Sequence, residues 1–143
     1  MRKLFNTNFN QEGVHMMLLV LRVAIAVFML VHGYQKLQYL TSGAPIQFMD
    51  LFGIGTTASL ALAVFAEFFC SIFLLLGFGT RLAVVPLIVT MLIAIFMVHG
   101  ADPFDKKELA YHYLVVYLFL LVVGSGKYSV DYFISRNQSR RRR

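Results

Sequence analysis

Long runs of mostly apolar residues constrain this chain more than any other feature. They cover about residues 14–36, 57–78, 82–99 and 108–124. A helix that crosses the hydrocarbon core of a bilayer needs roughly 20 mostly apolar residues. Each run is apolar on nearly all sides, unlike the one-sided stripe of a helix in a soluble protein. The runs therefore predict an all-α protein, a transmembrane four-helix bundle.

The composition supports a membrane environment. Hydrophobic residues make up 59% of the chain and charged residues only 14%, whereas soluble domains are about half apolar and a quarter charged. The length of 143 residues allows one domain. Because this apolar excess is too large for one soluble core, the lipid bilayer is expected to contact much of the surface.

The basic residues predict an orientation, because cytoplasmic ends of membrane helices are enriched in Lys and Arg. The side with both termini and the turn after the second run carries nine of them: Arg2, Lys3, Arg81, Lys127, Arg136 and Arg140 to Arg143. The other side carries Lys36, Lys106 and Lys107. Both termini are therefore expected to be cytoplasmic. Residues 1–13 form a cytoplasmic segment, 14–133 the membrane domain and 134–143 a basic cytoplasmic tail.

The formal net charge of +6 does not indicate a nucleic-acid partner. Much of it sits at the extreme C-terminus, and not on a folded basic face as in a nucleic-acid-binding module. A terminal basic run is more simply a topology signal or an anchor on anionic lipid. Cys70 is the only cysteine, so no intrachain disulfide and no Cys-rich metal site can form.

Two charged residues interrupt the first two runs. Arg22 lies roughly 12 Å from the cytoplasmic start of its helix, and Glu67 roughly 15 Å from the outer start of the next. Opposite charges near the midplane on consecutive helices predict a buried pair. The pair either fixes helix register or relays a proton or substrate. The structural role is favoured, because a relay normally shows more than two ionisable groups at one depth.

A second polar group gathers at the predicted outer ends of the helices. Its members are His32, Gln35, Lys36, His99, Glu108 and His112. The tripeptide Val-His-Gly recurs at the ends of the first and third runs, which would place His32 and His99 at equivalent depth. The loop of about residues 37–56 contains an apolar stretch that is expected to lie in the interface as a short helix or re-entrant piece.

The outer polar group has several readings. Histidine can hydrogen-bond a quinone carbonyl and exchange a proton near neutral pH, which makes the group a candidate quinone pocket. Three histidines and a carboxylate can also hold a transition metal, but no tight ligand motif is present and no metal is assigned. In the plainest reading, these residues anchor helix ends at the interface.

Four short motifs together resemble the DoxX family of bacterial membrane proteins. They are Leu21-Arg22 followed by His32-Gly33 and Lys36; Ala66-Glu67 followed by Leu75-Leu76-Gly77 and Gly79-Thr80-Arg81-Leu82; His99-Gly100; and the closing run from Gly124 to Asp131. The resemblance covers about residues 16–131. It implies a four-helix, multi-pass protein of the bacterial inner (plasma) membrane, associated with redox complexes. Related families include a subunit of a thiosulfate:quinone oxidoreductase.

The leading functional hypothesis is a membrane subunit of a redox complex, anchoring an oxidoreductase partner protein. It would offer a quinone pocket lined by His32, Lys36, His99 and His112. One alternative is a small-molecule carrier, which with four spans would have to form a homo-oligomer around the midplane pair. Another is a non-catalytic membrane scaffold. Catalytic residues are not assigned, and the three readings stay open.

Overall fold

The computed structural model describes residues 10–51 and 53–141, and within them the chain is helical with no strand. Two short π-helices, η1 and η2, continue longer α-helices. In chain order the elements are α1 Gln11–Thr41, α2 Thr56–Val64, η1 Phe65–Cys70, α3 Ser71–Leu76, α4 Thr80–Ile93, η2 Ala94–Val98, α5 Phe104–Val123 and α6 Val130–Arg141.

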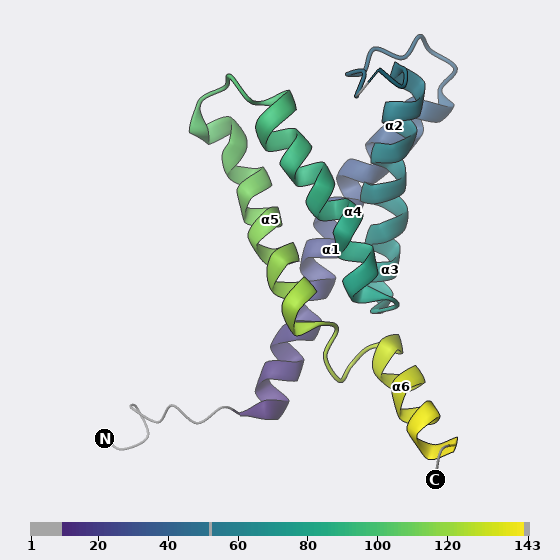
Figure 1. The fold of residues 1–143 in the computed structure, drawn as a ribbon, viewed down its shortest axis with the longest axis vertical. Helices are drawn as coiled ribbons and strands as arrows, with labels where there is room; N and C mark the ends of the chain where they lie inside the picture. The colour runs from purple at the N-terminus through teal and green to yellow at the C-terminus, as the bar shows by residue number, and fades with distance from the viewer. Residues whose placement is uncertain (1–9, 52, 142–143) are drawn as a thin grey trace.

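Three helical segments of the described chain are long and apolar enough to cross a membrane: Gln11–Thr41, Thr56–Leu76 and Thr80–Val98. With α5 they run side by side (Figure 1). The start of α1, the α3–α4 turn and the loop before α6 lie at one end, called here the terminus end. The opposite end, called here the loop end, holds residues 42–51, 53–55 and 99–103.

Two glycines make the tight turn between α3 and α4. Gly77 ends α3 with φ 68° and Gly79 precedes α4 with φ 57°. Both angles lie in the left-handed region, which residues with a Cβ rarely adopt. Phe78 between them donates its N–H to the carbonyl of Phe73. The turn therefore sends α4 straight back along α3.

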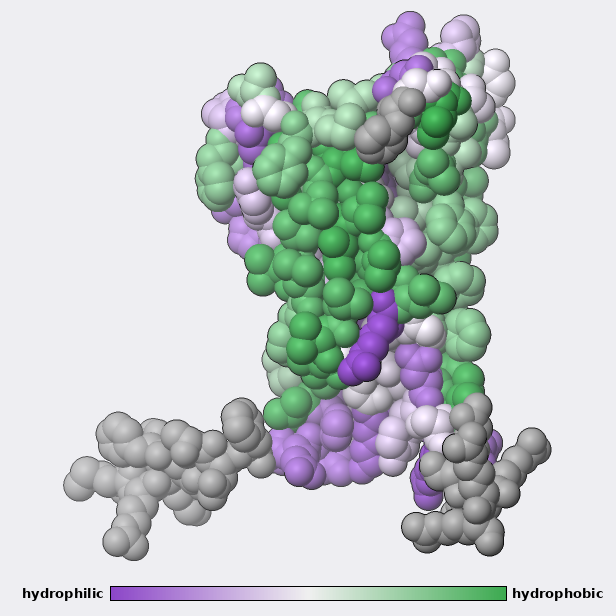
Figure 2. All heavy atoms as spheres, viewed as in Figure 1, coloured by the Kyte–Doolittle hydropathy of each residue, from purple (hydrophilic) through white to green (hydrophobic). Residues whose placement is uncertain are grey.

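The helices pack around a small apolar core and leave much apolar surface outside. Leu74, Leu87 and Leu120 are fully buried between neighbouring helices. By contrast, Leu82 is 79% exposed and Val122 75% exposed. Figure 2 shows the face of the molecule seen in Figure 1: hydrophobic residues cover most of its height, and hydrophilic residues lie at its two ends. So wide an apolar surface is expected against lipid rather than water.

The helices of the structure differ from the expected runs in three places. The first helix extends to Thr41, five residues beyond the predicted end of its span at 36. Residues 42–51 and 53–55 contain no helix, so of the two expected forms of this loop, a short interfacial helix or a re-entrant piece, the helix is not formed in its described part. The last helix of the bundle ends at Val123, because Gly124 turns the chain with φ 85°. The separate helix α6 then crosses the predicted boundary at 133.

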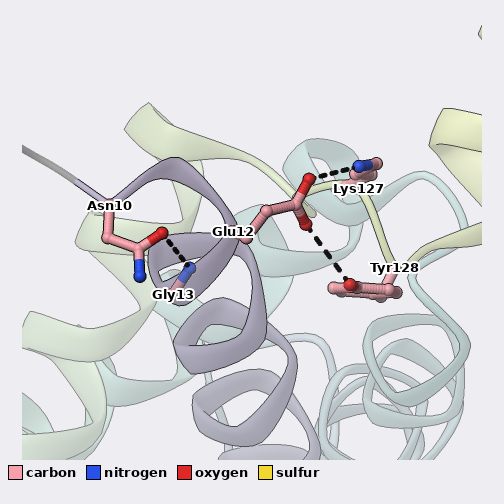
Figure 3. A network of polar contacts seen from close by, with 5 residues as sticks. All are labelled: Asn10, Glu12, Gly13, Lys127 and Tyr128. Carbon is pink, nitrogen blue, oxygen red and sulfur yellow. Dashed lines mark hydrogen bonds and ion pairs between the residues drawn. The ribbon is translucent and has the colours of Figure 1, made fainter.

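Side chains of α1 hold the loop between α5 and α6 in place at the terminus end. Arg22 is 2% exposed, and its two terminal nitrogens donate to the backbone carbonyls of Ser125 at 2.7 Å and Tyr128 at 2.8 Å. In the first turn of α1, Glu12 accepts from the Lys127 ammonium at 2.5 Å and from the Tyr128 hydroxyl at 3.4 Å (Figure 3). The loop after α5 is thus clasped against α1.

Asp131 ties the same loop to the start of α4. Its Oδ1 accepts from the Gly79 N–H at 2.6 Å and its Oδ2 from the Thr80 N–H at 3.0 Å. Partial burial acts to raise the pKa of Asp131, but these backbone donors outweigh it and hold that pKa below its usual value. A carboxylate at a helix N-terminus satisfies free N–H groups and complements the helix dipole.

Asp131→Asn is expected to lower the free energy of unfolding at pH 7 by about 1–2 kcal/mol, as for the loss of a helix cap. Because the folded-state pKa is lowered, the carboxylate stabilises the fold above its unfolded pKa, and this contribution disappears as pH falls through the folded value. Unfolding titrations in mixed micelles should therefore show the difference at pH 7 and its shrinkage in acid. The control is Glu108→Gln, which alters an exposed carboxylate beyond the first turn of α5. A pH-independent difference for Asp131→Asn would contradict the assignment.

Candidate functional site

The predicted pair of Arg22 and Glu67 is not formed. Arg22 donates to the carbonyls of the loop after α5 at the terminus end. Glu67 instead accepts from the Lys36 ammonium, which forms an ion pair with its Oε1. Each of the two charges therefore has its own partner, at different levels of the bundle.

The pairing was wrong because the two residues do not lie at the same depth. The prediction ended the first span near residue 36, whereas α1 continues to Thr41. The backbone of Glu67 lies against Gly33, where an added Cβ would be 2.6 Å from the Glu67 carbonyl. Gly33 is about three turns, or roughly 16 Å, further along α1 than Arg22. This offset leaves Glu67 within reach of Lys36 and far from Arg22.

A cavity of about 200 Å³ opens beside this ion pair at the loop-end half of the bundle. Residues from α1, η1, α4, η2 and α5 line it, together with His99, which follows η2. They are Met29, His32, Lys36, Glu67, Met91, Ala94, His99, Lys106, Leu109, Ala110 and Tyr113. The lining combines an apolar wall with charged and aromatic groups, which is typical of small-molecule sites.

The two π-helices both contribute to this cavity. Glu67 lies within η1, and η2 leads directly to His99, whose N–H bonds the carbonyl of Ala94 five residues earlier at 2.9 Å. A π-helical turn inserts an extra residue in an α-helix and is frequent at functional sites. Here the extra residues change the direction in which the side chains of Glu67 and His99 leave their helices.

Two histidines supply titratable groups to the lining. The Nδ1 atom of His99 lies 2.7 Å from the carboxylate of Asp102, which orients the ring and leaves Nε2 for another partner. The ring of His32 meets that of Tyr113 edge-on, with centroids 6.3 Å apart. The Val-His-Gly repeat therefore brings both histidines to one cavity.

Not all of the predicted outer group reaches this cavity. His32, Lys36 and His99 line it, whereas Gln35 lines a groove on the other side of α1 with Tyr34. Glu108 and His112 lie outside the lining, and the His112 ring contacts the backbone carbonyl of Glu108 at 2.9 Å. That contact lies along the exposed face of α5.

Two cavity residues escaped the sequence-based assignment. Tyr113 is 5% exposed and lines the cavity together with Glu67. Lys106 also lines it and had been counted only for topology. The sequence offered only a weak indication of Tyr113, its position next to His112. Consecutive residues on a helix point about 100° apart, so only the packing of α5 decides which of the two faces the cavity.

No metal centre is assembled from the described residues: 10–51 and 53–141 contain no group of three or more His, Cys, Asp or Glu placed to hold an ion. The histidines of the outer group are divided between the cavity and the α5 surface. The cavity instead offers hydrogen-bond donors and one carboxylate to a small organic ligand.

Comparison with curated proteins and with solved structures finds no match. The DoxX family profile matches residues 17–100. This range includes Arg22, Glu67 and the histidines of the cavity, and it ends before α5. The match covers more than half of the chain and agrees with the apolar helices of the structure. The chain is therefore a multi-pass membrane protein that belongs to the DoxX family.

Proposed function

We propose that this protein is a membrane subunit of a redox complex that binds a quinone head group in the loop-end cavity. The observation that carries the proposal is the meeting of Lys36, Glu67, His32 and His99 around one small cavity. A quinone, when bound, would supply two-electron chemistry coupled to protons. The protein's residues would hold its ring and exchange those protons.

The cavity chemistry fits a single substituted ring. Its volume of about 200 Å³ is below the usual range for drug-sized ligands, roughly 300–1,000 Å³. Met29 and Met91 present polarisable thioethers that contact ring faces and edges favourably. The Lys36 ammonium and a protonated His32 nitrogen can each donate to a carbonyl oxygen. A neutral imidazole has one nitrogen that donates and one that accepts, so a histidine can pass protons to and from the site.

The proposal includes a topology of four spans with both termini cytoplasmic, in the inner membrane of a bacterium. Support for α5 as the fourth span comes from its exposed apolar side chains, among them Val115 and Val122. The terminus end carries most of the basic residues, as cytoplasmic ends do. The cavity would then lie toward the outer leaflet.

The carrier alternative has less support. It relied on Arg22 and Glu67 sharing a midplane site, but each bonds a different partner. The scaffold alternative leaves unexplained why a buried carboxylate faces a cavity. The redox-subunit proposal accounts for both observations, with Arg22 as a structural residue and Glu67 as part of the site.

The proposal predicts that duroquinone, a quinone without a tail, binds to the purified protein and that the cavity variants His32→Ala and Lys36→Met weaken binding at least about tenfold. Loss of one hydrogen bond to a charged group gives an effect of this size. Equilibrium dialysis in mild detergent measures the dissociation constants. Mass spectrometry of protein purified from native membranes should also find an oxidoreductase partner.

The matched control is His112→Ala, which removes a histidine at the same end of the bundle outside the cavity lining. This variant should bind duroquinone as the parent chain does. Binding that is unchanged in His32→Ala and Lys36→Met would reject the cavity as the quinone site. A homo-oligomer without a partner would argue against a redox subunit and favour the carrier.

A further inference from the structure

One carboxylate oxygen in the cavity lacks a hydrogen-bond donor. Glu67 is 2% exposed, and its Oε1 is taken by the Lys36 ammonium. Its Oε2 is buried and has no hydrogen-bond partner within residues 10–51 and 53–141. Buried polar atoms are nearly always bonded, and an unbonded one on a charged group is especially unfavourable. The Oε2 atom therefore needs a donor from the cavity.

The described residues make no hydrogen bond to this oxygen. The close contact between Gly33 and the Glu67 backbone holds η1 against α1. The carboxylate is anchored at Oε1 by Lys36, whose side chain is 32% exposed and lies toward the cavity mouth. Because Glu67 lines the cavity, a ligand held there can supply the donor that completes the site.

We infer that the cavity is selective for a ligand that presents a phenolic hydroxyl, and thus for the reduced, hydroquinone form of a quinone over the oxidised form. This inference rests on the function proposed above. An ionised carboxylate is only an acceptor, and a quinone carbonyl is also only an acceptor, so Oε2 and that carbonyl repel one another. A hydroquinone O–H donates to Oε2 and satisfies it.

The Lys36 ammonium completes this recognition. Its nitrogen is bound to the other oxygen of the same carboxylate, so its remaining protons lie close to a hydroxyl placed on Oε2. That hydroxyl can donate to Glu67 while its oxygen accepts from Lys36. Both contacts are charge-assisted and stronger than neutral hydrogen bonds. An ether in place of the hydroxyl loses the first contact.

The test compares three ligands on the unaltered protein in mild detergent, without oxygen: durohydroquinone, duroquinone and the dimethyl ether of durohydroquinone. Equilibrium dialysis measures each dissociation constant. Durohydroquinone is expected to bind about tenfold tighter than duroquinone, the size of one charge-assisted hydrogen bond. The ether is expected to bind no tighter than the quinone. This comparison needs no variant, so it does not depend on a mutant folding.

Two variants assign the preference to its residue. Glu67→Gln keeps the size of the side chain and adds an N–H donor, so the preference for durohydroquinone should fall below about threefold. The control Glu108→Gln alters a carboxylate outside the cavity lining and should leave the preference intact. A full preference in Glu67→Gln would overturn the role of Glu67.

The outcomes separate this inference from the proposed function. Tight durohydroquinone binding with weak binding of quinone and ether supports both. Duroquinone binding as tightly as durohydroquinone, or tighter, overturns the selectivity and leaves the quinone site standing. Durohydroquinone and its ether binding equally also overturn it, because the hydroxyl proton would then be unused. If neither quinone form binds, the proposed function fails and the inference with it.

Discussion

Arg22→Leu is expected to lower the free energy of unfolding by about 3 kcal/mol, because two hydrogen bonds to a charged group are lost together. The partners are the backbone carbonyls of Ser125 and Tyr128. A hydrophobic replacement can compensate for a buried ion pair only when both charges are removed. Backbone carbonyls cannot be removed, so they lose their donors and the loop after α5 loses its attachment to α1.

The two carbonyls at this site require the planar pair of donors that an arginine presents. Arg22→Lys should recover less than half of the loss, because one ammonium cannot reproduce the planar pair of donors. The matched control is Arg81→Leu, which removes an exposed arginine with one carbonyl contact, to Val122 at 3.1 Å. That variant should cost below about 1 kcal/mol. Unfolding titrations in mixed detergent micelles measure the free energy of unfolding of all three variants. Equal losses in Arg22→Leu and Arg81→Leu would contradict the role of Arg22 in attaching the loop after α5 to α1.

Gly33→Ala is expected to destabilise the protein by about 2–3 kcal/mol, the usual effect of overpacking at a tight contact. The new Cβ would lie 2.6 Å from the backbone of Glu67 and 2.6 Å from the nitrogen of Phe68. Backbone atoms cannot rotate aside as a side chain does, so α1 and η1 must separate. The separation also pulls Lys36 away from Glu67, and quinone binding should weaken with stability.

A second glycine of α1 provides the control. At Gly13 the nearest atom to an added Cβ is the side-chain nitrogen of Asn10, at 3.2 Å, and that side chain can shift. The Asn10 side chain also caps α1 by accepting from the Gly13 N–H at 3.3 Å. Gly13→Ala should therefore change the free energy of unfolding by at most about 1 kcal/mol in either direction, because the gain in helix propensity offsets any weakening of this cap. The measurement is the same unfolding titration combined with duroquinone dialysis. A Gly33→Ala protein as stable as Gly13→Ala would show that the contact is not tight.

Four of the eleven residues that line the candidate cavity were singled out from the sequence. His32, Lys36 and His99 stood out because polar residues at the ends of apolar runs are few. Glu67 stood out for its burial, but the charge rule paired it with Arg22. The rule failed because it compared depths from estimated span ends, and an error of five residues along α1 moves a side chain by about 7 Å.

The choice among neighbouring residues could not be made from the sequence. His112 and Tyr113 are adjacent on α5, and the apolar pattern of that helix extends all round it, so no polar face marks which one points inward. The π-helical turns are equally hidden, since η1 and η2, apart from Glu67, contain only residues common in membrane helices. Both features depend on how α1, α4 and α5 pack.

The sequence by itself determined the apolar helices and their lipid environment, because backbone groups in hydrocarbon must be bonded within each segment and this requires long apolar runs. Tertiary structure alone decided the partners of the buried charges. The contact at Gly33 sets α1 against η1, so Glu67 meets Lys36, while Arg22 reaches the loop after α5. Hydropathy shows which segments can lie in lipid, whereas the partner of a buried charge depends on which helix faces touch.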